Sequence, residues 1–297
     1  MGFKCGIVGL PNVGKSTLFN ALTASKNAEA ANFPFCTIDP NIGVVDVIDK
    51  RLDNLSELSN SKKKIYTNIT FVDIAGLVKG ASKGEGLGNK FLSHIREVDA
   101  IIHLVRCFSS DKITHVNSEI NPLNDLETIQ TEILLSDIDL IQKKLEKSKK
   151  KLLKEKDIEI LENKLNQLNK GQDKISNNED EKKFLSSIGL LSIKPKIIVC
   201  NVDEKSLATG NKFTEMVKTK YSKEKIVTIC ADIEDQIMGL DKDERETFMK
   251  EIGLDKTGLN QLIKEGYDLL DLDTFFTSGP EESRAWTVKK NTLAPKA

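Results

Sequence analysis

Residues 9–16 constrain the fold more than any other part of the chain. They read Gly-Leu-Pro-Asn-Val-Gly-Lys-Ser and fit the phosphate-loop pattern G-x-x-x-x-G-K-[ST], directly after the apolar run 5–8. The glycines allow a tight turn whose backbone N–H groups face an anion, and the helix that follows adds the positive end of its dipole. A glycine turn before an amphipathic helix, with no phosphate ligand, is the alternative interpretation.

Two side chains of this loop have a chemistry suited to a bound triphosphate. We expect Lys15 to reach the terminal phosphates and, together with Mg²⁺, to stabilise charge on the transferred phosphoryl group. The hydroxyl of Ser16 is a suitable Mg²⁺ ligand. Lys15 is therefore a candidate catalytic residue and Ser16 a candidate metal ligand.

Short β-branched runs alternate with helical patterns along the chain. This alternation predicts an α/β fold in which a doubly wound, mostly parallel sheet has helices on both faces. The expected strands are residues 4–8, 44–48, 69–74, 100–105, 196–200 and 226–230. Two further helices are expected near residues 244–251 and 257–270. The phosphate loop then lies at a carboxyl end of the sheet, where ligands bind in such folds.

Residues 123–190 differ in composition from the rest of the chain. They are rich in Lys, Glu, Leu and Ile, with apolar positions at helical spacing. We interpret them as an antiparallel helical hairpin inserted into a nucleotide-binding domain formed by residues 1–122 and 191–271. The polar stretch 171–181 is either a loop or a break within the second arm.

A new segment begins at about residue 272. Residues 284–288 have the pattern of a strand, but 272–297 are too few to close a core of their own. Either this segment packs on the main domain, or it is part of a further domain.

Composition narrows the class of protein. The net charge of -1 gives no general attraction to nucleic acid, so any basic binding surface is local. The five cysteines are scattered and mostly flanked by apolar residues, which favours reduced thiols and a cytoplasmic location. We find neither a leader nor an apolar run long enough to span a bilayer, so no membrane association is expected. A monomer is the default, because no apolar heptad seam is present.

Two further loops have the residues of a nucleotide switch. Asp73 and Gly76 form a D-x-x-G string after the run 69–72, where the Asp holds Mg²⁺ through water and the glycine N–H bonds a γ-phosphate. Thr37 lies between the first expected helix and the second expected strand, where a hydroxyl closes on Mg²⁺ in the triphosphate state. The glycine-rich stretch 77–88 is either part of this switch or a surface loop without a switch role.

Three strings give the chain a specific resemblance. They are residues 9–17 (GLPNVGKST), 32–37 (NFPFCT) and 72–84 (VDIAGLVKGASKG). On these motifs the chain resembles, over essentially its whole length, the YchF subfamily of Obg-like ATPases, within the TRAFAC class of P-loop NTPases. The TGS domain of that family is longer than residues 272–297, so this segment is expected to be the incomplete start of a TGS-like domain.

The resemblance implies a set of site residues and a substrate. The phosphate-binding residues it implies are Asn12, Val13, Gly14, Lys15, Ser16 and Thr17. It also implies that Ser16 and Thr37 are Mg²⁺ ligands and that the substrate is ATP, with GTP tolerated.

The string Asn201-Val202-Asp203-Glu204 bears on the choice of base. GTPases use Asn-Lys-x-Asp at this place, where the final carboxylate accepts two hydrogen bonds that only guanine can donate. Glu204 stands at the final position and Val202 at the lysine position, so discrimination against adenine is weakened and ATP is favoured. We expect Asn201, Val202 and Glu204 to contact the base. Recognition of GTP by Asp203 remains the alternative.

The catalytic machinery differs from that of the best-known GTPases. Leu77 follows the D-x-x-G string, where a glutamine would orient the attacking water, so slow intrinsic turnover is expected. The family resemblance implicates His115 in hydrolysis, and a loop histidine without that role is the alternative. His103 is expected in the core, and His94 on a surface or in packing.

A lysine-dense stretch at residues 143–156 is the candidate basic surface. A solvated helix face is one interpretation, and contact with ribosomal RNA is the other, which the family's association with ribosomes favours. The leading hypothesis is a Mg²⁺-dependent ATPase that regulates a ribosome or translation partner through the helical hairpin and the TGS-like region. Three alternatives remain: a GTP-specific switch, a nucleotide-binding module with negligible turnover, and a metabolic kinase.

Overall fold

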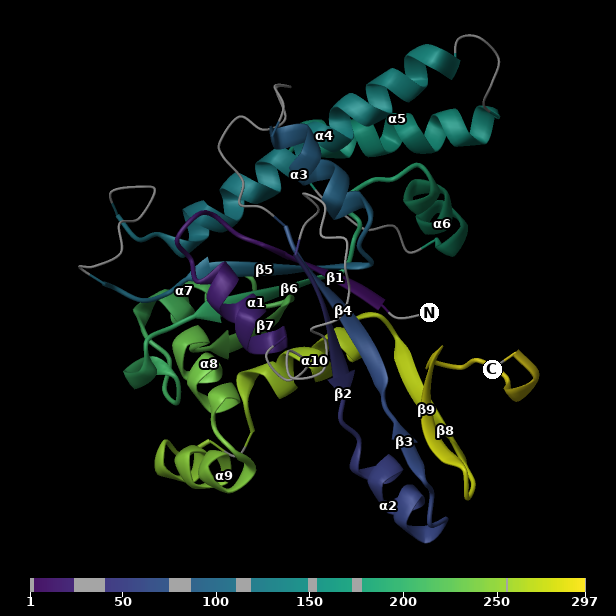
Figure 1. Cartoon of the computed structure of the whole chain (residues 1–297). Helices are drawn as coiled ribbons and strands as arrows, with labels where there is room; N and C mark the ends of the chain where they lie inside the picture. Colours follow the sequence, from purple (N-terminus) through teal and green to yellow (C-terminus); the bar gives the residue numbers. More distant parts are fainter. Residues whose placement is uncertain are drawn as a thin grey trace.

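The computed structural model describes residues 3–23, 41–74, 87–110, 119–148, 154–172, 178–254 and 256–296. Strands of these ranges form a six-stranded sheet in the order β2-β4-β1-β5-β6-β7 (Figure 1). Its members are β1 (Phe3–Val8), β2 (Asn41–Val47), β4 (Thr67–Asp73), β5 (Ala100–Arg106), β6 (Lys196–Asn201) and β7 (Lys225–Ile229). All six strands were expected from the sequence.

The sheet is parallel except at one edge. Neighbouring strands from β4 to β7 run in the same direction, whereas β2 pairs antiparallel with β4, from Asn41 opposite Asp73 to Val47 opposite Thr67. An antiparallel edge strand is common in doubly wound sheets. The prediction of a mostly parallel α/β sheet is therefore confirmed, with the direction of β2 as the exception.

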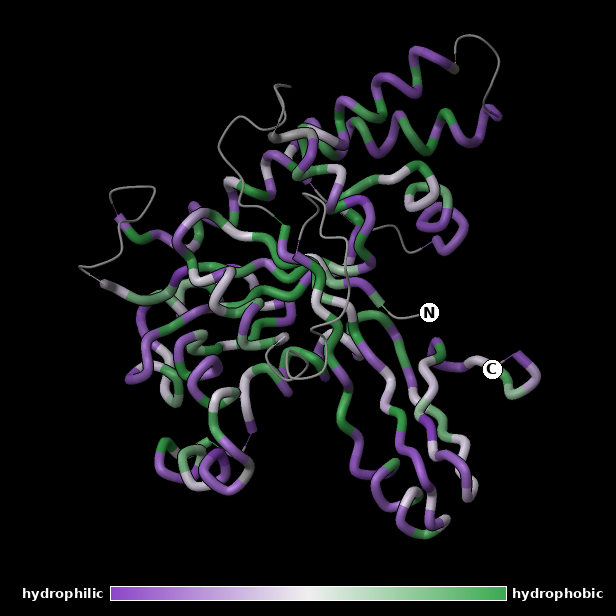
Figure 2. The backbone as a smooth tube through the Cα atoms, viewed as in Figure 1, coloured by the Kyte–Doolittle hydropathy of each residue, from purple (hydrophilic) through white to green (hydrophobic). Residues whose placement is uncertain are grey.

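Helices cover both sides of the sheet. In Figure 1, α3 and α4 lie above the strands, and α1, α8 and α10 lie below them. The helices outside the insertion are α1 (Lys15–Thr23), α2 (Lys50–Leu58), α3 (Leu87–Arg96), α7 (Lys212–Lys220), α8 (Ala231–Gly239), α9 (Lys242–Glu251) and α10 (Gly258–Leu269). With both faces covered, β5 is buried at every position, and the strands appear as hydrophobic segments in Figure 2. Burial of each Ile or Leu side chain stabilises the fold by roughly 1.5–3 kcal/mol.

Four of the cysteines lie in this core. Cys5, Cys107, Cys200 and Cys230 are buried free thiols, as the sequence predicted. Cys36 lies outside the described residues.

The inserted segment forms helices α4 (Pro122–Ser148), α5 (Glu155–Asn169) and α6 (Glu179–Ser187). The first two pack against each other and share a buried apolar cluster with Leu185 and Leu190. Helix α5 ends before the stretch 171–181, and α6 begins within it, where the Asn178 side chain accepts hydrogen bonds from the N–H groups of Asp180 (2.9 Å) and Glu181 (3.4 Å). A third helix therefore follows the expected hairpin.

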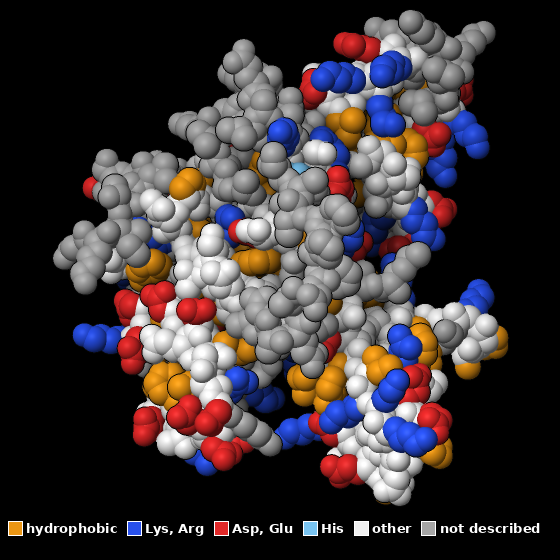
Figure 3. Space-filling view, in the orientation of Figure 1, with side chains coloured by type: hydrophobic (Ala, Val, Ile, Leu, Met, Phe, Trp, Pro, Cys, Tyr) orange, Lys and Arg blue, Asp and Glu red, His pale blue; other side chains and the backbone are white. Residues whose placement is uncertain are grey.

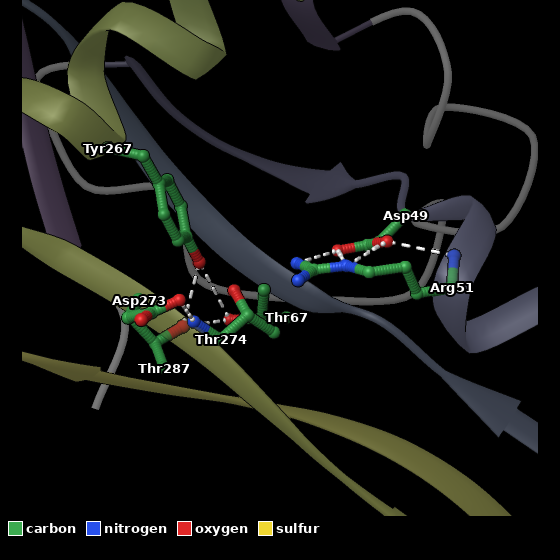
Figure 4. A network of polar contacts seen from close by, with 7 residues as sticks. All are labelled: Asp49, Arg51, Thr67, Tyr267, Asp273, Thr274 and Thr287. Carbon is green, nitrogen blue, oxygen red and sulfur yellow. Dashed lines mark hydrogen bonds and ion pairs between the residues drawn. The ribbon is translucent and has the colours of Figure 1, made fainter. Parts of the chain in front are cut away.

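The last strands form a second sheet. Strands β3 (Lys63–Ile65), β9 (Glu282–Lys289) and β8 (Leu272–Ser278) lie in that order. The Tyr267 hydroxyl donates to Thr67 (3.2 Å) and is hydrogen-bonded to Thr287 (2.7 Å), joining α10, β4 and β9 (Figure 4). The described residues after residue 272 thus contact α2, β4 and α10, and the start of a further domain at this point stays a prediction.

No helix within the described ranges combines the length and the apolar character that a bilayer span requires.

His103 occupies the core position expected for it. Its side chain is 7% exposed, between β5 and α4. Burial, with a smaller contribution from the Lys196 charge, lowers the pKa of this imidazole from 6.5 to about 3. His94 is half-buried on α3, in agreement with the packing position expected.

The low pKa of His103 predicts a loss of stability in acid. Below pH 6.5 the unfolded state binds a proton at this imidazole, while the folded state does not until about pH 3. The free energy of unfolding is therefore expected to fall by about 2 kcal/mol from this group between pH 7.5 and pH 5. Urea unfolding at both pH values measures the change. His103→Leu should lose that part of the pH dependence and His94→Gln should keep it; equal slopes for wild type and His103→Leu would contradict the prediction.

Candidate functional site

The phosphate-loop sequence folds as a turn between β1 and α1. Strand β1 ends at Val8 and helix α1 begins at Lys15. Asn12 (φ 63°) and Gly14 (φ 91°) have positive φ, and a Cβ added at Gly14 would lie 2.3 Å from Nδ2 of Asn201. Only glycine fits at position 14, both for its backbone conformation and for the space available.

The Asn201 side chain holds the phosphate loop in position through hydrogen bonds. Its Nδ2 donates to the carbonyl oxygen of Val13 (2.9 Å), and its Oδ1 accepts from the N–H of Ala231 (2.9 Å). The residue is only 4% exposed. Both ends of its amide bind backbone groups, which fixes two loops relative to each other. Contact of Asn201 with a base stays a prediction, and the residue lines the candidate cavity.

Two charged residues of the predicted site meet at the carboxyl end of the sheet. Lys15, the first residue of α1, forms an ion pair with Asp73, the last residue of β4. Their side chains are 13% and 8% exposed. The fold thus brings together a cation and a carboxylate that are 58 residues apart in the sequence.

A cavity of about 800 Å³ opens beside this pair. It extends from the phosphate loop to the loops that follow β5, β6 and β7, and its size is that of a small-molecule site. The lining residues are Leu10, Pro11, Asn12, Gly14, Lys15, Ser16, Thr17, Phe108, Ser110, Asn201, Val202, Asp203, Glu204, Cys230, Asp232, Ile233 and Gln236. Val13 lies behind the wall, 1% exposed.

Four polar or aromatic residues of this wall were not found from the sequence. Phe108 and Ser110 follow β5, and Asp232 and Gln236 lie on α8 after β7. Their place after the carboxyl ends of expected strands was the available signal, since ligands of such sheets bind there.

The residues after β6 divide into buried and exposed groups. Val202 is 2% exposed and packs in the core, while its N–H donates to the carbonyl of Ile229 (2.8 Å). The Asp203 carboxylate accepts from the N–H of Ser206 (2.9 Å) and caps the short helix Glu204–Ser206. Glu204 is exposed at the cavity wall. Asp203 and Glu204 thus both line the cavity, and the Asp203 carboxylate is also engaged in a turn.

Several predicted residues lie outside the described residues. They are Thr37, Gly76, Leu77 and His115, together with residues 149–153 of the lysine-dense stretch. Within the described ranges, no three His, Cys, Asp or Glu side chains gather as a metal site would require.

A second cavity, of about 30 Å³, lies between α4 and β5. His103 and Ser192 line it, and it has room for about two water molecules. A nucleotide does not fit there.

Comparisons with known proteins agree with the fold. Residues 4–201 match the protein family described as "50S ribosome-binding GTPase". The chain is 48% identical over 308 residues to the "Ribosome-binding ATPase YchF" of Bacillus subtilis (strain 168), covering 99% of this chain and 83% of that protein. It is 48% identical over 306 residues to the protein of the same name from Escherichia coli O157:H7, covering 100% and 84%.

A solved structure is similar along the whole chain. It is described as "Structure of the Schizosaccharomyces pombe YchF GTPase", with a TM-score of 0.85 and 35% sequence identity. The similarity covers 100% of this chain and 83% of that one.

The double contact of Asn201 predicts the effect of its removal. Asn201→Ala leaves the Val13 carbonyl and the Ala231 N–H without these partners in a buried place, which costs about 1–3 kcal/mol for each group. Urea unfolding is expected to show a loss of about 2–6 kcal/mol in the free energy of unfolding. Asn163→Ala, at an exposed site of α5, is the control and should leave the midpoint nearly unchanged. Equal midpoints for Asn201→Ala and wild type would contradict this stabilising role of Asn201.

Proposed function

The chain belongs to the YchF family of P-loop proteins, and from that membership we propose that it hydrolyses ATP with Mg²⁺ and regulates a ribosome-associated process. The observation that supports this most strongly is the cavity at the carboxyl end of the sheet. Its wall contains the phosphate loop, and Lys15 and Asp73 meet beside it. We further propose the domain limits 1–122 with 191–271, the insertion 123–190, and a TGS-like start at 272–297.

The phosphate chain would bind along residues 12–17, where the start of α1 and the turn at Gly14 favour an anion. In this arrangement Lys15 exchanges its contact with Asp73 for the terminal phosphates. Asp73 is then available to a hydrated cation, and the Ser16 hydroxyl, exposed at the cavity, supplies a further oxygen. Thr37 is proposed as the remaining protein ligand. Oxygen donors of this kind fit Mg²⁺.

Hydrolysis in this proposal depends mainly on positioning and charge. Mg²⁺, when bound, would neutralise negative charge on the phosphates. Lys15 stabilises the charge that develops on the transferred phosphoryl group, and the phosphate loop aligns that group. The attacking water lacks the usual glutamine because Leu77 stands in its place, so turnover is slow. His115 is proposed to hold this water.

The base is proposed to be adenine. The names of relatives differ on this point, since two are called ATPases and the structure from Schizosaccharomyces pombe a GTPase. Here Asp203 is engaged with the Ser206 N–H, and Glu204 reaches the cavity with a longer side chain than the aspartate of GTPases. A GTP-specific switch would need one of these carboxylates to accept two guanine hydrogen bonds, which Asp203 would have to do in addition to its bond from the Ser206 N–H.

The ribosome is the proposed partner, as in the names of the relatives. Helix α4 ends in a lysine-rich stretch that includes Lys143, Lys144 and Lys147. Figure 3 shows Lys and Arg side chains over the helical insertion, at the upper right. Cationic helix faces of this type bind the RNA phosphate backbone.

Nucleotide affinities test the choice of base. Wild type is expected to bind ATP more tightly than GTP in the presence of Mg²⁺, and Glu204→Asp is expected to bind GTP at least about 10-fold more tightly than wild type does, because the shorter carboxylate fits guanine. Titration with fluorescent ATP and GTP analogues measures both. Glu251→Asp, at an exposed site of α9, is the control. Tighter binding of GTP than ATP by wild type would favour the GTPase alternative, and binding without phosphate release in a single turnover would favour the binding module.

Ribosome co-sedimentation tests the partner. Replacing Lys143, Lys144 and Lys147 by Gln should weaken ribosome binding and reduce its salt dependence, because up to three phosphate contacts are lost. The matched control replaces Lys218, Lys220 and Lys223 by Gln, which removes the same charge at and after the end of α7. Equal weakening by both triple variants would indicate a general charge effect and contradict a site on the insertion.

A further inference from the structure

An arginine is buried next to Asn201, the residue that holds the phosphate loop in position. Arg106 is the last residue of β5, its side chain is 1% exposed, and it is among the largest fully buried side chains of the described residues. Its register partner on β6 is Asn201. Arg106 thus lies next to the residue that joins the phosphate loop to the loop after β7.

The guanidinium holds one wall of the candidate nucleotide cavity. Its Nε donates to the carbonyl oxygen of Phe108 (3.1 Å), and its Nη2 lies 3.5 Å from the carbonyl oxygen of Ser110. The guanidinium carbon lies 4.7 Å from the centre of the Phe108 ring. Phe108 and Ser110 both line the cavity, so the conformation of this wall depends on Arg106.

The helical insertion supplies the countercharge. Asp125 lies in the first turn of α4 and is 1% exposed. Burial lowers the pKa of Arg106, and the Asp125 charge opposes that shift. Leu126, the residue after Asp125, packs in one buried cluster with Val105 and Cys107, which flank Arg106 in the sequence. The first turn of the insertion therefore packs against the end of β5.

We propose that Arg106 is a positioning residue for nucleotide binding that couples the cavity wall at Phe108 and Ser110 to the base of the helical insertion through Asp125. The inference rests on the proposed function, because it takes the cavity to be the ATP site. In this proposal, a nucleotide that orders Phe108 and Ser110 also orders the Arg106 guanidinium. The ordered guanidinium in turn restrains the first turn of α4. By linkage, a partner that holds α4 changes ATP affinity by the same factor as ATP changes affinity for that partner.

Hydrogen exchange on the wild-type chain measures the coupling directly. Saturating ATP with Mg²⁺ should slow exchange in the amides of residues 122–128, at the start of α4. In Asp125→Asn, ATP should still bind but this added protection should be absent. Glu127→Gln is the matched control, because Glu127 lies two residues after Asp125 in the same helix and forms an exposed ion pair with Lys220 (3.3 Å). That variant should respond to ATP like wild type.

ATP affinity and steady-state kinetics distinguish a positioning role of Arg106 from an effect on stability alone. Arg106→Gln is expected to weaken ATP binding by about 10-fold or more and to raise KM with kcat nearly unchanged, because a charged hydrogen-bonded contact to the wall is lost. Arg106→Lys keeps the charge near Asp125 and should recover part of the affinity. Thermal unfolding of both variants reports whether they remain folded.

The outcomes are distinct. Wild-type affinity for ATP in folded Arg106→Gln and Arg106→Lys, or no ATP-dependent protection at residues 122–128 in wild type, would overturn the coupling and leave the proposed function intact. If Arg106→Gln does not fold, Arg106→Lys and the wild-type exchange measurement decide the question. Wild-type protein that binds neither ATP nor GTP would overturn the proposed function and this inference with it.

Discussion

The side-chain amide of Asn201 is the contact on which the rest of the site depends. One hydrogen bond fixes the phosphate loop at Val13, and the other fixes the start of α8 at Ala231. These segments are 188 and 30 residues from Asn201 in the sequence, so neither geometry follows from local preference. Gly14 must lack a Cβ because the amide occupies that space. These two hydrogen bonds hold the loop in a defined shape before an anion binds, which reduces the ordering needed on binding.

The sheet was predictable because each of its strands contains a short apolar run, which in β5 is buried at every position. Such runs are recognisable without knowledge of their neighbours, and all six were located from the sequence. Strand β3 was missed because its three residues, two of them exposed lysines, have no apolar alternation. Strand β8 was missed although its Phe275 and Phe276 favour a strand, and the direction of β2 was missed because periodicity carries no information on pairing.

The site was predictable where short motifs fix backbone geometry, and not where distant segments meet. The phosphate loop and Asp73 were located by pattern, and they lie together at the end of the sheet. The position of Asn201 behind the loop could not be read from its motif, because that motif suggests only a role near the base. Phe108, Asp232 and Arg106 have no motif, and their roles depend on which strand ends lie side by side. Thr37, Gly76 and His115 lie outside the described residues, so the roles predicted for them are tested by experiment alone.

The second sheet has a consequence for synthesis of the chain. Strand β3 pairs in parallel with β9, and the serine hydroxyls of Ser61 and Ser283, which are hydrogen-bonded beside this pair, are 222 residues apart. On a ribosome, β3 therefore emerges long before its partner exists, and its backbone N–H and C=O groups on that edge remain in water until β9 has left the exit tunnel. Contacts of this sequence separation form late, because loop closure precedes any stabilisation they provide. All strands of the main sheet, from β1 to β7, thus precede β9 in the chain, so that sheet can be complete while this edge is still open.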